Sequence, residues 1–269
     1  MKLIALQIKT TSNFQENLTH LKDLINSCEK DSLILAPELA LSGFSYDRME
    51  EAAQFSRKAI EEIQELSNDK TIALTFITKK ENKFFNTLYL FHNLQIIHSQ
   101  SKVKLFPLGN ELEYFSPGQE EDIKIIEING LKIATLICFE LRFPQLWEKI
   151  KGADVILNPA MWGLKRKDHY ESISKALALV NQCFVIACNS ANDNMAKGSA
   201  IISPFGNVIK DDLVIGNTTK CNILKCEAPS ICAASTIALG TCINACLNKN
   251  IPKILTELEI INPVYVLSS

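Results

Sequence analysis

The chain alternates short apolar runs with amphipathic stretches from its first residues onward. Residues 2–9 and 31–38 are apolar runs with β character, and residues 13–30 between them place apolar side chains at helical spacing. Residues 55–67 return to a 3.6-residue period after the second run. This succession of strand and helix predicts a layered α/β fold.

The middle of the chain predicts neighbouring antiparallel strands. Residues 123–128 and 131–138 flank Asn129-Gly130, the strongest short hairpin signal in the sequence. Further strands are expected at 71–78, 84–91, 94–100, 153–159, 183–190, 199–204 and 207–210, and a further helix at 168–182. The sheets are therefore expected to be mixed, and they need helices to cover them.

The domain organisation follows from where this pattern stops. No repeat or Pro/Gly-rich linker interrupts residues 1–212, which we interpret as one domain, followed by a divergent cysteine-rich tail at 213–269. Residues 228–248 carry no charge and have the length of a membrane span. Asn244, Gly240 and several hydroxyl residues dilute their hydrophobicity, so a buried or interface segment is favoured over a span.

Composition narrows the class of protein. With 269 residues, 47% of them hydrophobic, and a net charge of −2, the chain predicts a globular protein without the basic surface that nucleic acid requires. Gln7 and Lys9 interrupt the N-terminal apolar run, so no signal peptide is indicated. Nine cysteines without a C-x-x-C pair favour free thiols in a reducing cytoplasm.

Three residues with catalytic potential follow predicted strands. Cys138 ends one strand, Glu38 follows another, and Lys102 follows a third. A thiol can act as nucleophile, a carboxylate in an apolar pocket as proton acceptor, and an ammonium as oxyanion partner. Taken singly, each has an ordinary alternative: a buried space-filling cysteine, a solvated or helix-capping glutamate, and a surface lysine such as Lys104.

Together and in this order, the segments around these residues resemble the nitrilase superfamily of carbon-nitrogen hydrolases. The matching segments are Pro37-Glu38, Lys102-Val103-Lys104-Leu105-Phe106 and Cys138-Phe139-Glu140-Leu141-Arg142-Phe143. The resemblance extends over about residues 2–210. It implies a four-layer α-β-β-α sandwich, a Glu38-Lys102-Cys138 triad with Lys102 rather than Lys104, Glu111 rather than Glu113 as supporting glutamate, and pairing into a homodimer or higher homo-oligomer.

The C-F-E-L-R-F-P form and the Trp162 loop are similar to the omega-amidase-like branch, which implies a small amide as substrate. Arg142 is a candidate partner for a distal carboxylate, with a structural bridge to Glu140 or to a neighbouring loop as the alternative. Phe44 and Trp162 are candidate pocket walls. Leu177 and Val180 stand where the family usually has arginine and glutamate, which puts packing or subunit contact in doubt.

Other functions remain open at this point. A nitrilase or an N-carbamoyl hydrolase would share the triad, and a catalytically silent binding protein would share the fold. The sequence contains no H-E-x-x-H, G-x-x-x-x-G-K-[ST] or G-x-G-x-x-G motif, so we expect neither metal nor cofactor.

Overall fold

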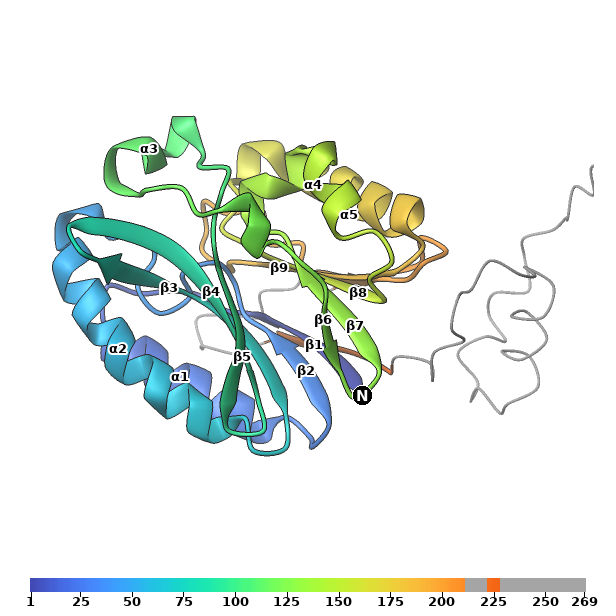
Figure 1. Ribbon diagram of the computed structural model, residues 1–269, viewed down its shortest axis with the longest axis horizontal. Coiled ribbons are helices and arrows are strands. Elements are labelled where there is room, and N and C mark those ends of the chain that lie inside the picture. The colour runs from blue at the N-terminus through green and yellow to red at the C-terminus, as the bar shows by residue number, and fades with distance from the viewer. Residues whose placement is uncertain (211–221, 228–269) are drawn as a thin grey trace, which may run out of the picture. The chain divides into compact units, whose positions relative to one another are not determined.

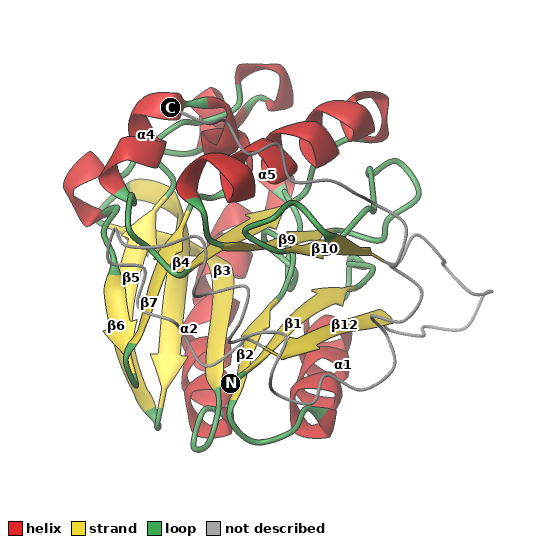
Figure 2. Cartoon of the chain, turned by 90° about the vertical axis from the view of Figure 1, so that its right-hand side faces the viewer, coloured by secondary structure: helices red, strands yellow, loops and turns green. Residues whose placement is uncertain are grey.

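The computed structural model describes residues 1–210 and 222–227, which form two six-stranded sheets with helices outside them (Figures 1 and 2). The first sheet has the order β12-β1-β2-β3-β4-β5 and the second β11-β10-β9-β8-β7-β6. The sheets face each other, α1 and α2 cover the outer face of the first, and α4 and α5 cover the second (Figure 2). The predicted four-layer sandwich of mixed sheets is confirmed.

The strands and helices have the following bounds. The first sheet contains β1 (Lys2–Gln7), β2 (Ser32–Leu35), β3 (Thr71–Lys80), β4 (Lys83–His92), β5 (Gln95–Ser101) and β12 (Asn222–Glu227). The second contains β6 (Ile126–Ile128), β7 (Leu131–Thr135), β8 (Val155–Ala160), β9 (Phe184–Asn189), β10 (Ala200–Ile202) and β11 (Val208–Lys210). The helices are α1 (Phe14–Ser27), α2 (Met49–Leu66), α3 (Glu111–Tyr114), α4 (Pro144–Lys149) and α5 (Lys167–Asn181).

The alternation of side chains along β1 explains the layers. Leu3 and Ala5 belong to the core between the sheets, whereas Ile4 and Leu6 pack under α1 and α2. A strand buried on both faces appears in the sequence as a continuous apolar run, as residues 3–6 do. Such strands pair in parallel in both sheets. In the first sheet β1 pairs with β2 and β2 with β3, and in the second β7 pairs with β8 and β8 with β9.

One strand of the first sheet comes after residue 212, where the sequence predicted the end of the domain. Residues 222–227 form β12, which pairs antiparallel with β1, and residues 1–228 make one compact unit. Residues 211–221 are not among the described residues, so the division at 212 stays a prediction. Most of the tail, including the uncharged stretch 228–248, also lies outside the described residues. Among the described helices, none is both long and apolar enough to cross a membrane.

Candidate active site

The three predicted catalytic residues lie where strands of both sheets end. Glu38 follows β2 and Lys102 follows β5 in the first sheet, while Cys138 begins a short 3-10 turn, η4 (Cys138–Arg142), after β7 in the second. Cys138 has a φ of 46°, a left-handed conformation that is uncommon for a residue with a side chain. The sandwich thus brings the thiol of one sheet to the carboxylate and ammonium of the other.

Lys102 is the centre of a buried ionic cluster. Its Nζ lies 2.7 Å from Glu38 Oε1 and 2.7 Å from Glu111 Oε1, and the Lys102 and Glu38 side chains are both fully buried. Burial lowers the pKa of Lys102, but the Glu38 and Glu111 carboxylates outweigh this and raise it, so the ammonium stays protonated. Two buried carboxyl groups therefore share one ammonium, and burial raises the pKa of Glu111.

The Glu38 carboxylate is held on both of its oxygens. Asn86 Nδ2 donates to Oε1 at 2.8 Å, and the Met161 N–H donates to Oε2 at 3.2 Å. Glu111 is held in a similar way, because its Oε2 accepts the Phe106 N–H at 3.1 Å. Both carboxylates therefore keep fixed orientations in a site from which water is largely excluded.

The surroundings of Cys138 keep its thiol protonated at rest. Burial raises the pKa of the thiol well above its usual value, the Glu38 charge and a hydrogen bond to Glu38 raise it further, and the Lys102 ammonium opposes them. The thiol consequently needs a base to become a nucleophile. Glu38 is the group in hydrogen-bond contact with it that can accept the proton.

The alternative lysine and glutamate occupy different surroundings. Lys104 pairs with Glu120, and both side chains are partly exposed. Glu113 is exposed, whereas Glu111 is 2% exposed. The cluster beside Cys138 contains Lys102 and Glu111, the members that the resemblance singled out.

The candidate pocket residues lie around this cluster. The Phe44 ring centroid is 5.8 Å from Lys102 Nζ, and the Arg142 guanidinium lies 4.9 Å from the Trp162 ring centroid. Arg142 Nη2 also donates to His169 Nδ1 at 2.9 Å, so this ring nitrogen acts as an acceptor. The bridge from Arg142 to Glu140 is not formed, because Glu140 binds backbone N–H groups instead.

A second guanidinium accompanies Arg142. The charge of Arg166 lowers the pKa of Arg142, in addition to the larger effect of burial, and Arg166 lies 5.3 Å from the ring centroid of Phe106. Within the described part of the chain, neither arginine forms an ion pair with a carboxylate. Two neighbouring cations without an anion are an arrangement suited to an acidic ligand.

Sequence reasoning overlooked three contributors to this site. Asn86 is a fully buried amide within the mostly apolar run of residues 84–91, a break in the pattern that is visible in the sequence. Glu140 was visible beside Cys138, but nothing in the spacing indicates what it binds. Arg166 carries no signal in the sequence, because its approach to Arg142 depends on the turn before α5.

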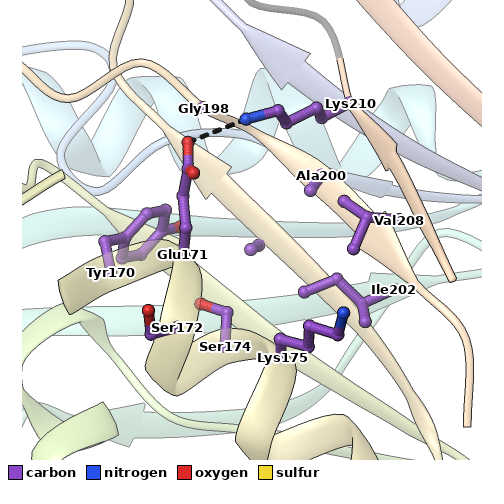
Figure 3. Close-up of a pocket in the computed structure, with 11 residues that line it drawn as sticks. Tyr170, Glu171, Ser172, Ser174, Lys175, Gly198, Ala200, Ile202, Val208 and Lys210 are labelled. Atoms are coloured by element: carbon purple, nitrogen blue, oxygen red, sulfur yellow. Dashed lines mark hydrogen bonds and ion pairs between the residues drawn. The ribbon is translucent and has the colours of Figure 1, made fainter. Parts of the chain in front are cut away.

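A separate hollow of about 240 Å³ lies away from the cluster, between α5 and the strands β10 and β11 (Figure 3). Lys175 and the Glu171–Lys210 ion pair border it, and most of the remaining lining is apolar. None of Glu38, Lys102 and Cys138 lines this hollow. Among the described residues, no group of three His, Cys, Asp or Glu side chains is arranged to hold a metal ion.

Comparisons with known proteins agree with this architecture. The chain is 33% identical over 198 residues to the 2-oxoglutaramate amidase of Bacillus subtilis, covering 68% of this chain and 76% of that protein. It is 28% identical over 204 residues to the omega-amidase YafV of Escherichia coli K12, covering 72% of this chain and 77% of the relative.

Solved structures show the same fold. A CN-hydrolase superfamily protein from Xanthomonas campestris, XC1258, superimposes with a TM-score of 0.73 at 22% identity, over 85% of this chain and 91% of the other. The NitN amidase from Nesterenkonia sp. AN1 gives 0.73 at 18% identity, over 86% and 93%. The family model for carbon-nitrogen hydrolases matches residues 3–212. From this match and the relatives above, we conclude that the chain belongs to the carbon-nitrogen hydrolase family.

Proposed function

We propose that this carbon-nitrogen hydrolase cleaves the amide of a small carboxylated monoamide, using Cys138 as nucleophile, Glu38 as general base and Lys102 as oxyanion partner. The observation that carries the proposal is the buried Glu38–Lys102–Glu111 cluster beside the thiol. Ionic groups are costly to bury without a purpose, and these three surround the only kind of side chain present that forms a thioester.

The acylation half of the reaction uses Cys138 as nucleophile, Glu38 as base and then acid, and Lys102 as oxyanion partner. Glu38 takes the Cys138 proton, and the sulfur attacks the amide carbon to form a tetrahedral oxyanion. Lys102 stabilises this charge together with the Phe139 N–H, which lies in the first turn of η4 where helical N–H groups lack intrahelical partners. The C–N bond then breaks, and Glu38 returns its proton to the nitrogen, so that ammonia leaves.

Deacylation repeats the proton transfers with water. Glu38 accepts a proton from water, whose oxygen attacks the thioester carbon. The C–S bond breaks, the acid is released, and the proton returns to the Cys138 sulfur. Glu111 supports both halves, because a second carboxylate at 2.7 Å fixes the position of the ammonium without being required to accept a proton.

The acidic substrate is supported by the arginines and by the relatives. Arg142 and Arg166 lie at the Trp162 side of the site without carboxylate partners among the described residues. Of the relatives named above, that of Bacillus subtilis is a 2-oxoglutaramate amidase and that of Escherichia coli is an omega-amidase. Phe44 and Trp162 would form the walls against the carbon chain of the substrate.

Ammonia release from a panel of compounds tests the proposal. We expect release from five-carbon dicarboxylate monoamides with the wild type and none with Cys138→Ala. Arg142→Ala should raise KM for these monoamides roughly tenfold to a hundredfold, because a charge-assisted hydrogen bond is lost, and leave a neutral amide of equal length unaffected. Faster turnover of a nitrile or an N-carbamoyl compound than of the monoamides would favour a nitrilase or an N-carbamoyl hydrolase. No turnover of any compound in the panel would favour a binding protein.

We also propose a homo-oligomer in the cytoplasm. Leu179, Val180 and Phe205 are exposed apolar side chains, and Gly206, next to Phe205, lies beside Leu179. A second copy of the chain that covers this patch would explain why Val180 stands where the family usually has a charged residue. Leu177, the other departure, is fully buried in the core. The free thiols of Cys138 and Cys183 support a reducing compartment.

A further inference from the structure

Glu140 is a buried carboxylate for which the catalytic cycle above has no use. Its side chain is fully buried in η4, two residues after the nucleophile. Oε1 accepts the Val103 N–H at 2.6 Å, and Oε2 accepts the Ile137 N–H at 2.6 Å. One side chain therefore joins the residue that follows Lys102 to the residue that precedes Cys138.

Besides Glu140, one hydrogen bond joins the ends of these two segments, from Gln100 Nε2 to the Thr135 carbonyl at 3.2 Å. Lys102 follows β5 at the edge of the first sheet, and Cys138 follows β7 in the second, so no backbone ladder connects them. The left-handed backbone of Cys138 also needs support from its surroundings, and the Ile137 N–H is the donor immediately before it. The Glu140 carboxylate links both segments directly.

The chemistry of the link suits a carboxylate better than an amide. An ionised carboxylate accepts hydrogen bonds on both oxygens, whereas a glutamine side chain presents one acceptor and one donor group to the same two N–H donors. Burial raises the pKa of Glu140 to about 7, and the Val103 and Ile137 N–H groups and the Lys102 charge act in the opposite direction. These bonds and the Lys102 charge offset part of the effect of burial, so that the carboxyl group ionises near neutral pH.

We infer that Glu140 is a positioning residue that sets the distance between the Cys138 nucleophile and the Lys102 ammonium by tying the two strand ends together across the sheets. The inference rests on the roles proposed for Cys138 and Lys102. Its effect is confined to the step in which both must meet one substrate atom, the attack that places charge on the carbonyl oxygen.

Two substitutions separate this role from simple stabilisation. Glu140→Gln loses one of the two acceptors, and Glu140→Asp keeps the charge and can still reach Ile137, three residues away, but is too short for Val103. We expect kcat for the monoamide to fall about tenfold to a hundredfold in both variants with KM little changed, the range typical of a reacting group displaced by about an ångström.

Alkylation of Cys138 by iodoacetamide, followed by peptide mass spectrometry, is the second readout. This displacement builds no oxyanion and does not need Lys102 at a set distance, so its rate should stay near that of the wild type while hydrolysis falls. The matched control is Asp154→Asn, because Asp154 Oδ2 accepts the Lys132 N–H at 2.8 Å at the opposite end of the same sheet. This control should hydrolyse at the wild-type rate.

The possible outcomes are distinct. Wild-type kcat in Glu140→Asp or Glu140→Gln overturns the inference, and so does an equal fall of hydrolysis and alkylation or a failure of both variants to fold, since each indicates a structural role only. A wild type that releases no more ammonia than Cys138→Ala overturns the proposed function itself, which is a different result from an inactive Cys138→Ala beside fully active Glu140 variants.

Discussion

The Lys102 ammonium and its two carboxylates set the electrostatic character of the site. Each carboxylate is tolerable in the interior because the ammonium lies 2.7 Å from it. Burial is the main cause of the raised pKa of the Cys138 thiol, and the Glu38 and Glu111 carboxylates raise it further while Lys102 opposes them. The resting enzyme is therefore expected to hold a neutral thiol that ionises only as it attacks.

Removing the Lys102 ammonium should show how much the two buried carboxylates depend on it. We expect Lys102→Met to lower the free energy of unfolding by about 3–5 kcal/mol at pH 8, because Glu38 and Glu111 are left buried without a cation. The loss should be smaller at pH 5, where one carboxyl group can take up a proton at lower cost.

Urea denaturation at the two pH values measures this difference. Lys104→Met is the control, since its partner Glu120 is partly exposed, and we expect a much smaller loss there. An equal loss for Lys102→Met at pH 5 and pH 8 would contradict this account of the cluster.

The ionisation of Glu140 should make the free energy of unfolding depend on pH. Its pKa lies at about 7 in the folded chain against an ordinary value of 4.5, so the folded state binds the proton more tightly than the unfolded state does. The contribution of this group to folding is therefore fully present below pH 4.5 and is lost as the pH rises to 7, by about 3 kcal/mol.

The measurement is the free energy of unfolding of wild type and Glu140→Gln from pH 4.5 to 8. The wild type should lose stability relative to the variant across this window, because glutamine does not titrate. A difference between the two proteins that is constant with pH would rule out the raised pKa.

At the scale of elements, the pattern of apolar residues predicted long strands and helices well. The hairpin at Asn129-Gly130 joins β6 and β7, with φ values of 51° and 80° at the two turn residues. The start of α2 was placed too late, at residue 55 instead of Met49, because its first turns bury small side chains such as Ala52 and Ala53. The short helices α3 and α4 and the turn η4 are too brief to show a period.

The β6–β7 hairpin offers a test of this turn chemistry. Gly130→Ala should lower the free energy of unfolding by about 1 kcal/mol through its left-handed backbone alone, since an added methyl group meets no atom within 4 Å. Gly163→Ala is a matched control, because Gly163 has a φ of −69° and equally open surroundings. The midpoints of thermal unfolding of the two variants measure this difference. Equal midpoints would contradict the expected backbone strain at residue 130.

At the scale of the whole molecule, the sequence indicated which residues matter but could not show how they meet. The order of Glu38, Lys102 and Cys138 along the chain identified the family, and the structure brings them to one place from two sheets. Lys102 and Lys104 share a face only if the strand continues, and β5 ends at Ser101, so their surroundings differ. Glu140 and Arg166 act through contacts between distant segments, which no spacing in the sequence encodes.

The apolar patch of Leu179, Val180 and Phe205 makes a prediction about assembly. If a second copy covers it, Val180→Glu should place a charge in the contact and lower the molar mass measured by light scattering towards that of one chain. Leu108→Glu is a control, since Leu108 is exposed outside the patch. A wild-type mass of one chain, or a Val180→Glu variant of unchanged mass, would contradict the proposed interface.

The most direct test of the central claim is acylation of the nucleophile. Wild-type protein is mixed with a carboxylated monoamide, quenched with acid within the first turnover and digested, and the peptide that contains Cys138 is weighed by mass spectrometry. The account predicts that this peptide gains the mass of the acyl group as ammonia appears, and that Cys138→Ala shows neither. Ammonia released at equal rates by both proteins, with Cys138 unmodified, would contradict it.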